Sequence, residues 1–428
     1  MESITRRLRL KGGLGPEFRK LWAASTVSNL GDGIVLVAAP LLAAALTHDP
    51  ALVAGLAFTQ RLPWLLFALL SGALADRFDR QRIMAAVAVC RAALIGSLGV
   101  AVLLDRATLP VLYAVFFLLA TGETLFDTAA ATVLPAVVSR DALPRANARL
   151  AGTLTVTNQF VGPPLGSFLF ALAAALPFLL GAGGLAAAAA LILALRGSFR
   201  VVREVDAPPG NLRAEVLAGI RWLWSHRLLR TLALVLALLN ITVVAQVSIM
   251  VLFAQERLGL GPAGYGILVA TYGVGGVLGG LIAERVIARL GAGPVLRLAV
   301  CIEAAVPAAL ALSRAPVLAG AVLAFFGCHA VVWGALLSSL RQELTPAGLR
   351  GRVESAYRLI EYGGAAPGAL LGGLLATQFG LTAPFWAGAA TGAVLIPLVW
   401  STFSESSVAA ARREAEIMRE NMGSRSQG

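Results

Sequence analysis

Long apolar runs separated by short polar connections occupy almost the whole chain. Most of them reach the ~20 residues that an α-helix needs to cross a bilayer core about 30 Å thick. A transmembrane β-barrel would instead show segments of ~10 residues with strict alternation, and the sequence lacks that pattern. We therefore predict an all-α polytopic membrane protein. Its twelve transmembrane helices fall at about residues 20–46, 51–75, 82–104, 108–136, 148–173, 176–196, 229–254, 262–283, 293–312, 316–340, 354–378 and 383–402.

Composition and charge placement agree with this prediction. Hydrophobic residues make up 58% of the chain and charged residues 14%, whereas soluble globular proteins have about 45–50% and 25%. The net charge of +12 comes mainly from bases before the first span and in the even-numbered connections, while the odd-numbered connections hold only Arg106, Arg257 and Arg314. Because positive residues stay cytoplasmic, we expect both termini inside the plasma (inner) membrane. The basic character is a topology signal, and no nucleic-acid partner is expected.

Two similar phrases, about half the chain length apart, indicate an internal repeat. Each closes an apolar segment with an acid and then a base: Gly72-Ala73-Leu74-Ala75-Asp76-Arg77 and Gly280-Leu281-Ile282-Ala283-Glu284-Arg285. Repeated helical bundles are typical of secondary transporters, in which one half rocks against the other around a central site. We predict two pseudo-symmetric six-helix bundles. The domains are a cytoplasmic basic leader at 1–19, bundles at 20–196 and 229–403, a cytoplasmic linker with an amphipathic helix at 197–228, and a charged helical cytoplasmic tail at 404–428.

Small residues recur four positions apart in several spans. Four residues make about one helical turn, so such glycines share a face and let helix backbones approach closely. This spacing suits helices that slide during transport, and it equally suits ordinary tight packing. The candidate helix-packing residues are Gly162, Pro163, Gly166, Gly364, Gly368 and Gly372.

The motifs of this chain resemble those of the major facilitator superfamily over roughly residues 18–403. The superfamily's signature between spans two and three is similar to Gly72-x-Leu74-Ala75-Asp76-Arg77-x-x-Arg80-x-Arg82, although Asp79 replaces a common Gly and Gln81 a frequent base. Four other segments resemble a drug-efflux branch that includes macrolide exporters and the enterobactin exporter: Phe18-Arg19-x-Leu21-Trp22, Ser28-x-Leu30-Gly31-Asp32, Arg61-Leu62-Pro63 and Gly351-Arg352-Val353. The resemblance implies the major facilitator fold and transport by alternating access, and it leaves the substrate open.

The resemblance also implies a gating motif. Its residues would be Gly72, Asp76, Arg77, Arg80, Arg82, Gly280, Glu284 and Arg285. Asp76, at the cytoplasmic mouth, could meet the N-terminal end of span eleven, whose partial positive charge favours an anion. That contact would latch the two halves in the outward-facing state, and a solvated turn is the alternative.

The chain departs in two places from the superfamily's antiporter patterns, so those patterns do not by themselves indicate proton coupling. The superfamily's antiporter pattern in span four expects an Arg where this chain has Leu118, and the pattern in span five is matched only in part, by Gly162-Pro163-x-x-Gly166-Ser167. Coupling must therefore be argued from the charges inside the apolar segments.

Charged residues inside those segments are the candidate functional site, because a charge at the bilayer centre costs at least about 2.5–3.5 kcal/mol. The resemblance implies that spans one, four, seven and ten line the central cavity, which would place Asp32, Glu123 and Asp127 there. The alternative is a structural ion-pair network that joins Asp32 or Asp127 to Arg61 or Arg91. Further candidates for the cavity are His329 and Trp333 in span ten. Charged candidates of second rank are Glu303 in span nine and the neighbouring pair Arg358 and Glu361 in span eleven. Glu303 could pair with Arg358.

Three functions are compatible with these features. The first is export of amphipathic small molecules (drug, macrolide or siderophore-like) by proton antiport. The second is an importer or lysolipid-type carrier, and the third a non-transporting receptor or scaffold, which would have no need of buried carboxylates beside glycines. The sequence lacks a Gly-x-x-x-x-Gly-Lys-Ser/Thr loop, so an ATP-driven pump is not expected. We expect no enzymatic activity, cofactor or metal site; the expected partners are a small-molecule substrate, protons and the lipid bilayer, with the chain a monomer.

Overall fold

The computed structural model describes residues 14–75, 79–196, 212–346 and 349–425, and every regular element in these residues is a helix. The predicted all-α class is confirmed. The chain divides into two compact units: Met1–Thr47, Thr59–Arg203 and Gly261–Ala270 form the first, and His48–Phe58, Glu204–Leu260 and Thr271–Gly428 form the second. The exact domain boundaries given above stay a prediction.

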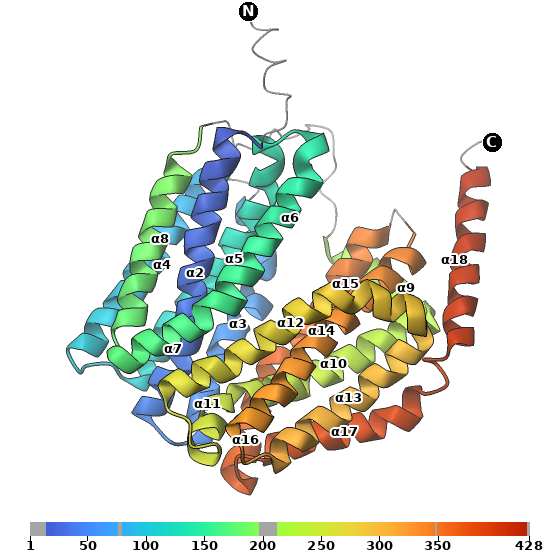
Figure 1. Cartoon of the computed structure of the whole chain (residues 1–428). Helices are drawn as coiled ribbons and strands as arrows, with labels where there is room; N and C mark the ends of the chain where they lie inside the picture. The colour runs from blue at the N-terminus through green and yellow to red at the C-terminus, as the bar shows by residue number, and fades with distance from the viewer. Residues whose placement is uncertain (1–13, 76–78, 197–211, 347–348, 426–428) are drawn as a thin grey trace, which may run out of the picture. The chain divides into compact units, whose positions relative to one another are not determined.

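The first unit is a bundle of long helices around a shared apolar core. Its elements are α2 (Gly15–Leu46), α3 (Pro50–Ala75) from Thr59 onward, α4 (Arg80–Leu103), α5 (Leu109–Val137), η1 (Arg140–Ala142), α6 (Leu143–Leu154), η2 (Thr155–Val161), α7 (Gly162–Leu172) and α8 (Leu176–Leu193). Helices α2 and α4 both pack against α8, and α5 packs against α4 (Figure 1). Phe18, Met84, Ala129 and Ile192 are buried in one core cluster, which joins α2, α4, α5 and α8.

Local sequence signals explain where helices of this unit begin and end. The Asp79 carboxylate accepts a hydrogen bond from the backbone amide of Arg82 at 3.1 Å and caps the first turn of α4. Helix α5 begins with Leu109-Pro110, where the missing N–H of proline costs nothing. Between these helices Asp105 has a φ of 53°, a left-handed conformation that Asp adopts more readily than most residues. The chain can therefore reverse within a short connection.

The predicted fifth span is broken by a π-helical turn. Helix α6 ends at Leu154, the π-helix η2 covers Thr155–Val161, and α7 continues from Gly162. A π-turn is rare and is found mostly as a local bulge inside an α-helix. The span is thus continuous in path but changes its winding halfway along.

Close backbone contacts within each unit are made at predicted glycines. A Cβ on Gly162 would lie 2.6 Å from the Cα of Gly33, and a Cβ on Gly166 would overlap the backbone of Ile34. In the second unit, Gly368 and Gly372 meet the backbone of α10 in the same way. At Gly364 a Cβ would lie 2.8 Å from the side chain of Ile241. Any larger side chain at these positions would force the helices apart.

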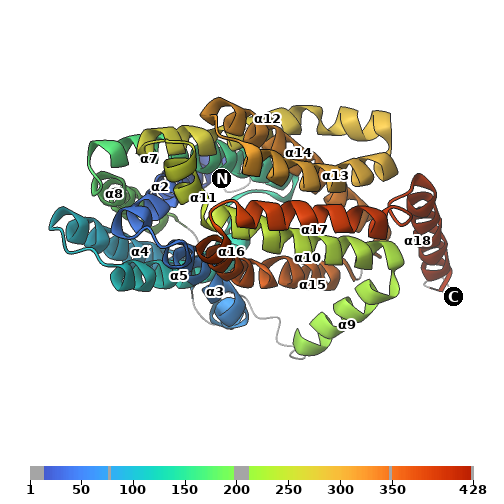
Figure 2. The same cartoon turned by 90° about the horizontal axis from the view of Figure 1, so that it is seen from below.

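The second unit is also all-helical in its described residues. Its elements are α9 (Leu212–Ser225), α10 (Arg227–Ser248), α11 (Met250–Leu252), η3 (Phe253–Arg257), α12 (Pro262–Leu290) from Thr271 onward, α13 (Ala292–Leu312), α14 (Pro316–Leu344), α15 (Arg350–Gly363), α16 (Ala365–Phe379), α17 (Ala383–Val399) and α18 (Glu405–Arg425). Helices α10 and α13 both pack against α17, and the three run side by side in Figures 1 and 2. Leu229, Leu296 and Phe403 lie in their buried core cluster.

The linker and the tail both contain helices that pack on the second unit. Helix α9 packs against α15, with Leu223 fully buried and Trp224 45% exposed. Residues 197–211 and the side chains of residues 212–218 lie outside the described part, so the amphipathic linker helix stays a prediction. Helix α18 begins at Glu405, whose Oε2 accepts a hydrogen bond from the Gly293 amide at 2.8 Å. The charged helix that the sequence indicates after residue 404 thus docks on α13.

Every predicted span is helical, but some spans consist of two helices rather than one. Among the described residues, eight helices are long and apolar enough to cross a membrane. Spans five and eleven are divided, into α6 with α7 and α15 with α16, and their parts are too short to pass that test singly. Helices α16 and α17 are bent by 117° at their junction, as expected for two successive spans.

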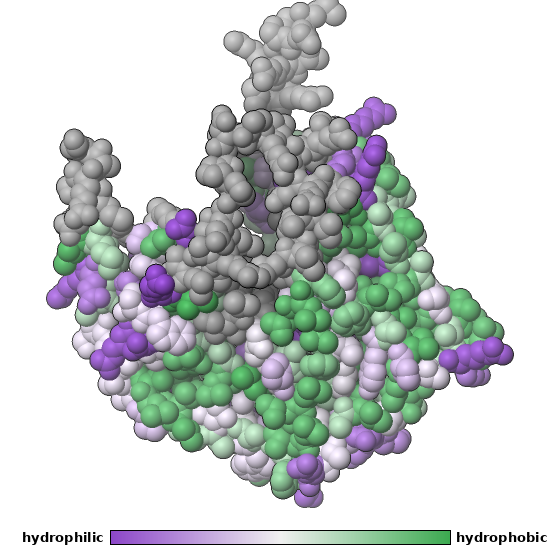
Figure 3. Space-filling model, turned by 180° about the vertical axis from the view of Figure 1, so that it is seen from behind, coloured by the Kyte–Doolittle hydropathy of each residue, from purple (hydrophilic) through white to green (hydrophobic). Residues whose placement is uncertain are grey.

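The surface of the helices is strongly apolar. Large side chains such as Leu103, Leu172, Val317 and Leu398 are between 63% and 86% exposed. Hydrophobic side chains predominate on the described surface in Figure 3. Exposed apolar area of this extent marks an interaction with a membrane or a partner, and on spans of this length it is the face that contacts lipid.

Candidate functional site

A partly buried ion pair joins two long helices of the first unit. Arg91 on α4 donates a hydrogen bond from Nη2 to Oδ1 of Asp32 on α2, at 2.9 Å. The Arg91 side chain is 7% exposed and that of Asp32 is 23% exposed. The Ser28 hydroxyl, one turn earlier on α2, lies 3.5 Å from the other Asp32 oxygen. Of the four pairings that the sequence left open, the structure forms Asp32 with Arg91.

Two more carboxylates lie near this pair. Glu123 and Asp127 are one turn apart on α5, and both act electrostatically on Arg91. Arg61, from α3, also acts electrostatically on Glu123. The structure gives neither carboxylate an ion pair with a described residue. These five residues form a cluster, called here the acidic cluster, that lies entirely in the first unit.

The acidic cluster holds more acids than bases. With every group ionised, three carboxylates face two guanidinium groups, and the net charge is −1. Arg91 is buried, Asp32 and Glu123 are half-buried, and Asp127 and Arg61 are exposed. The surplus negative charge around Arg91 favours a cation. Arg91 cannot give up a proton in a protein, which leaves the carboxylates as the groups that can gain and lose one.

The second unit contains a separate acid–base pair. Glu303 on α13 and His329 on α14 approach to 3.3 Å between Oε1 and Nε2, and their side chains are 9% and 5% exposed. The sequence suggested Arg358 as the partner of Glu303; the side chains of Arg358 and Glu361 lie outside the described residues, so that pairing stays untested. The pairing of Glu303 with His329 was not predicted, because no spacing rule shows which faces of two spans meet.

A cavity of about 300 Å³ adjoins this pair. It lies among α10, α12, α13, α14 and α15, and Trp333, a predicted cavity residue, lines it together with Glu303, Tyr272 and Phe326. Drug-sized ligands occupy pockets of about 300–1,000 Å³. The cavity is therefore large enough for a small organic molecule.

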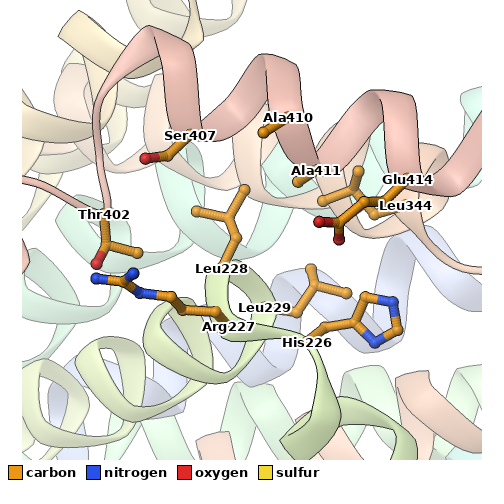
Figure 4. A pocket seen from close by; sticks show the side chains of 10 residues that line it. All are labelled: His226, Arg227, Leu228, Leu229, Leu344, Thr402, Ser407, Ala410, Ala411 and Glu414. Atoms are coloured by element: carbon orange, nitrogen blue, oxygen red, sulfur yellow. The ribbon is translucent and has the colours of Figure 1, made fainter.

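A smaller cavity of about 240 Å³ lies where α10 begins, between α10, α14 and α18. Figure 4 shows the side chains of Arg227 and His226 on one side of it, and Ser407 and Glu414 from α18 on the other. None of the predicted site residues lines this cavity. It exists because α18 docks on the unit, which the sequence did not indicate in any detail.

The predicted gating motif is described only in part. Asp76 and Arg77 lie outside the described residues, and Gly72 is helical but its surroundings are not described. Arg80 and Arg82 lie in the first turn of α4. In the repeated motif, Glu284 and Arg285 are exposed and Gly280 has open space beside it. The latch therefore stays a prediction.

One residue of this region has a structural task that the sequence did not reveal. Gln81 donates hydrogen bonds from Nε2 to the carbonyl oxygens of Ile192 and Leu195, at 2.8 and 2.9 Å. It therefore ties the start of α4 to the end of α8. In the sequence, Gln81 stands out only as a departure from the superfamily signature that this segment resembles.

Comparisons with known proteins agree with the fold. The family profile described as transmembrane secretion effector matches residues 15–421. The enterobactin exporter EntS of Shigella boydii serotype 4 (strain Sb227) is 27% identical over 363 residues, which cover 84% of this chain and 85% of the exporter. EntS of Escherichia coli O1:K1 / APEC matches with the same identity and coverage.

Solved structures show the same architecture. The crystal structure of the nucleoside transporter NupG superposes with a TM-score of 0.72 at 12% identity, covering 91% of this chain and 99% of NupG. A bacterial homologue of the iron transporter ferroportin, in an inward-facing state, gives a TM-score of 0.73 at 17% identity, with 90% and 98% coverage. At such identities the likeness establishes the fold alone. The match of the family profile over nearly the whole chain establishes more: the chain belongs to the transmembrane secretion effectors of the major facilitator superfamily, and it is a multi-pass membrane transporter of the exporter branch rather than an enzyme.

Proposed function

We propose that the chain exports amphipathic small molecules by alternating access, in exchange for protons. The observation that carries the proton part is the acidic cluster, with its partly buried Asp32–Arg91 pair and its surplus carboxylate. Export of an organic molecule is supported by the relatives whose name is enterobactin exporter. The proposed location is the plasma (inner) membrane, with both termini in the cytoplasm because the basic connections alternate with almost uncharged ones. The proposed transporting unit is a monomer.

The exchange follows from charge balance in the cluster. A proton on Asp32 removes the negative charge that holds Arg91 at 2.9 Å, so that Arg91 turns to Glu123 and Asp127. Loss of the proton restores the Asp32–Arg91 pair. A group that takes up its proton when open to the outside and loses it when open to the cytosol links each cycle to the entry of one proton. A ligand shifts such an equilibrium only through its different affinity for the two states.

The gating motif gives the proposed cycle its switch. Asp76 would contact the N-terminal end of span eleven in one state and release it in the other. Such a latch biases the two states without touching the substrate. In this proposal Asp76 affects the rate of turnover, and the acidic cluster couples transport to protons.

The available driving force is sufficient for export. One charge moving through about 100 mV supplies ~2.3 kcal/mol, and half a pH unit adds roughly 0.7 kcal/mol. Because about 1.4 kcal/mol corresponds to a factor of ten, one proton sustains roughly a hundredfold gradient of a neutral substrate.

Efflux into everted membrane vesicles tests the proposal. With a panel of amphipathic substrates and an imposed proton gradient, we expect wild-type vesicles to accumulate at least one substrate. Asp32→Asn should abolish accumulation while downhill exchange continues. Asp141→Asn, which neutralises an exposed acid outside the long helices, is the matched control and should transport normally. If Asp32→Asn still concentrates substrate like the wild type, Asp32 does not couple transport to protons.

A further inference from the structure

The cavity of the second unit has an unusual combination of walls. Tyr357 and the carboxylate of Glu303 line it together with three further aromatic side chains, Tyr272, Phe326 and Trp333. These rings and His329 form a row: ring centroids are 6.0 Å apart from Tyr272 to Phe326, 5.9 Å from Phe326 to His329, and 6.4 Å from His329 to Trp333. The remaining walls are largely aliphatic, from Leu236, Leu239 and Val243 of α10. The cavity thus joins apolar and aromatic surface to a single buried acid.

The row of rings follows from residue spacing on α14. Phe326, Ala330, Trp333 and Leu337 are three or four residues apart, so they lie along one face of the helix. Ala330 and Gly334 are the small residues of this face, and a Cβ placed on Gly334 would meet nothing within 4 Å. The small side chains leave the space that the aromatic side chains border.

These cavity walls favour a ligand with a positive charge. Aromatic faces attract a cation through the negative charge of the ring face, and rings grouped around a site are used to bind quaternary ammonium ligands. Glu303 adds a carboxylate with little exposure, whose described contact is a histidine rather than an Arg or Lys. Burying a carboxylate is costly unless it is paired, and no described Arg or Lys pairs with Glu303. A cationic ligand would therefore be stabilised beside it.

Among the residues that the structure describes, one permanent cation lines the cavity, Arg341, and it is already engaged. Arg341 lies 3.7 Å from the carboxylate of Glu354 and stacks over the ring of Tyr357, with its Cζ 3.9 Å from the ring centroid. It follows Trp333 by about two turns of α14, which is roughly 12 Å along the helix axis at 1.5 Å per residue. The end of the cavity next to Glu303 therefore keeps its negative character.

We propose that this cavity is the substrate subsite of the second unit, and that it takes an organic cation whose charge is carried on an apolar, aromatic body. Glu303 is the counter-ion, and Phe326, Trp333 and Tyr272 hold the apolar body. The proposal rests on the export function above, because it names the class of molecule exported. Exchange of such a cation for one proton moves no net charge, so the pH gradient alone would drive it at that stoichiometry.

Equilibrium binding to the purified full-length chain tests the proposal without any gradient. The probes are tetraphenylphosphonium and tetraphenylborate, which share a four-phenyl shape and carry opposite charges. We expect the wild type to bind the phosphonium at least tenfold more tightly than the borate. Glu303→Gln keeps the size and hydrogen bonding of the side chain and should remove most of that preference. Equal binding of the two ions by the wild type, or an unchanged preference in Glu303→Gln, would overturn the proposal.

A second variant tests the place of binding independently of the charge. Gly334→Leu puts a side chain into the cavity without a clash in the backbone, and should weaken phosphonium binding at least tenfold. Gly183→Leu is the matched control, because Gly183 also lies in the middle of an apolar helix with open space beside it. It should bind like the wild type. If Gly334→Leu binds the phosphonium as tightly as this control, the cavity is not the site.

These outcomes separate the two proposals. Asp32→Asn should retain phosphonium binding, since Asp32 lies in the other unit. Loss of proton-driven accumulation with intact, charge-selective binding supports both proposals. Normal accumulation by Asp32→Asn would reject the coupling role of Asp32 and leave the cation subsite standing, whereas absent charge selectivity would reject the subsite alone.

Discussion

Removing the two ends of the Asp32–Arg91 pair should have unequal effects on stability. Arg91→Gln leaves three carboxylates facing only Arg61 and changes the net charge of the acidic cluster from −1 to −2. Asp32→Asn leaves Arg91 with Glu123 and Asp127 and brings the net charge to 0. Both variants lose the same hydrogen bond, so the difference between them reports the charge environment.

The magnitudes follow from the geometry. At an effective dielectric constant of about 20, two unit charges 2.9 Å apart attract each other by roughly 6 kcal/mol. Breaking a buried pair from one side typically costs about 3–5 kcal/mol, and we expect Arg91→Gln to fall in that range. Asp32→Asn also removes the repulsion between Asp32 and the two carboxylates of α5, so its cost should be smaller, about 1–3 kcal/mol.

Denaturant titration of purified protein in detergent, at neutral pH, measures these differences as free energies of unfolding. The double variant Asp32→Asn/Arg91→Gln returns the cluster to a net charge of −1, and it should be more stable than Arg91→Gln alone. The reasoning fails if Arg91→Gln is as stable as Asp32→Asn, or if the second substitution destabilises Arg91→Gln further.

Two further predictions concern packing in the first unit. Gly166→Leu should greatly reduce the yield of folded protein, because its side chain would overlap the backbone of Ile34, whereas Gly183→Leu should not; size-exclusion profiles in detergent compare the two. Trp22→Phe loses the 2.7 Å hydrogen bond from its Nε1 to the Thr153 hydroxyl and weakens the contact with the Arg149 guanidinium, 4.4 Å from the ring centroid. Its free energy of unfolding should fall by about 1–2 kcal/mol, and an unchanged value would show that neither contact contributes.

The helices were predictable from sequence because the bilayer imposes a length and an apolarity on each span. The pairing of Asp32 with Arg91 was predictable only as one of four possibilities, since the chain shows that charges are present but not which helix faces they occupy. Glu303 illustrates the limit, because its partner His329 comes from another span and no periodicity connects them. The cavity beside Trp333 could not be foreseen either, because an empty volume depends on the mutual placement of five helices.

The π-helical turn at Thr155–Val161 makes this region sensitive to changes in chain length. A π-bulge holds one residue more than the regular α-helix it interrupts, and one residue corresponds to about 100° of rotation in an α-helix. Loss of a single residue here would let the turn relax into regular helix and would rotate everything that follows. Gly162 and Gly166 would then turn away from Gly33 and Ile34, and bulkier neighbours would take their place. We therefore expect this segment to tolerate substitutions but not insertions or deletions.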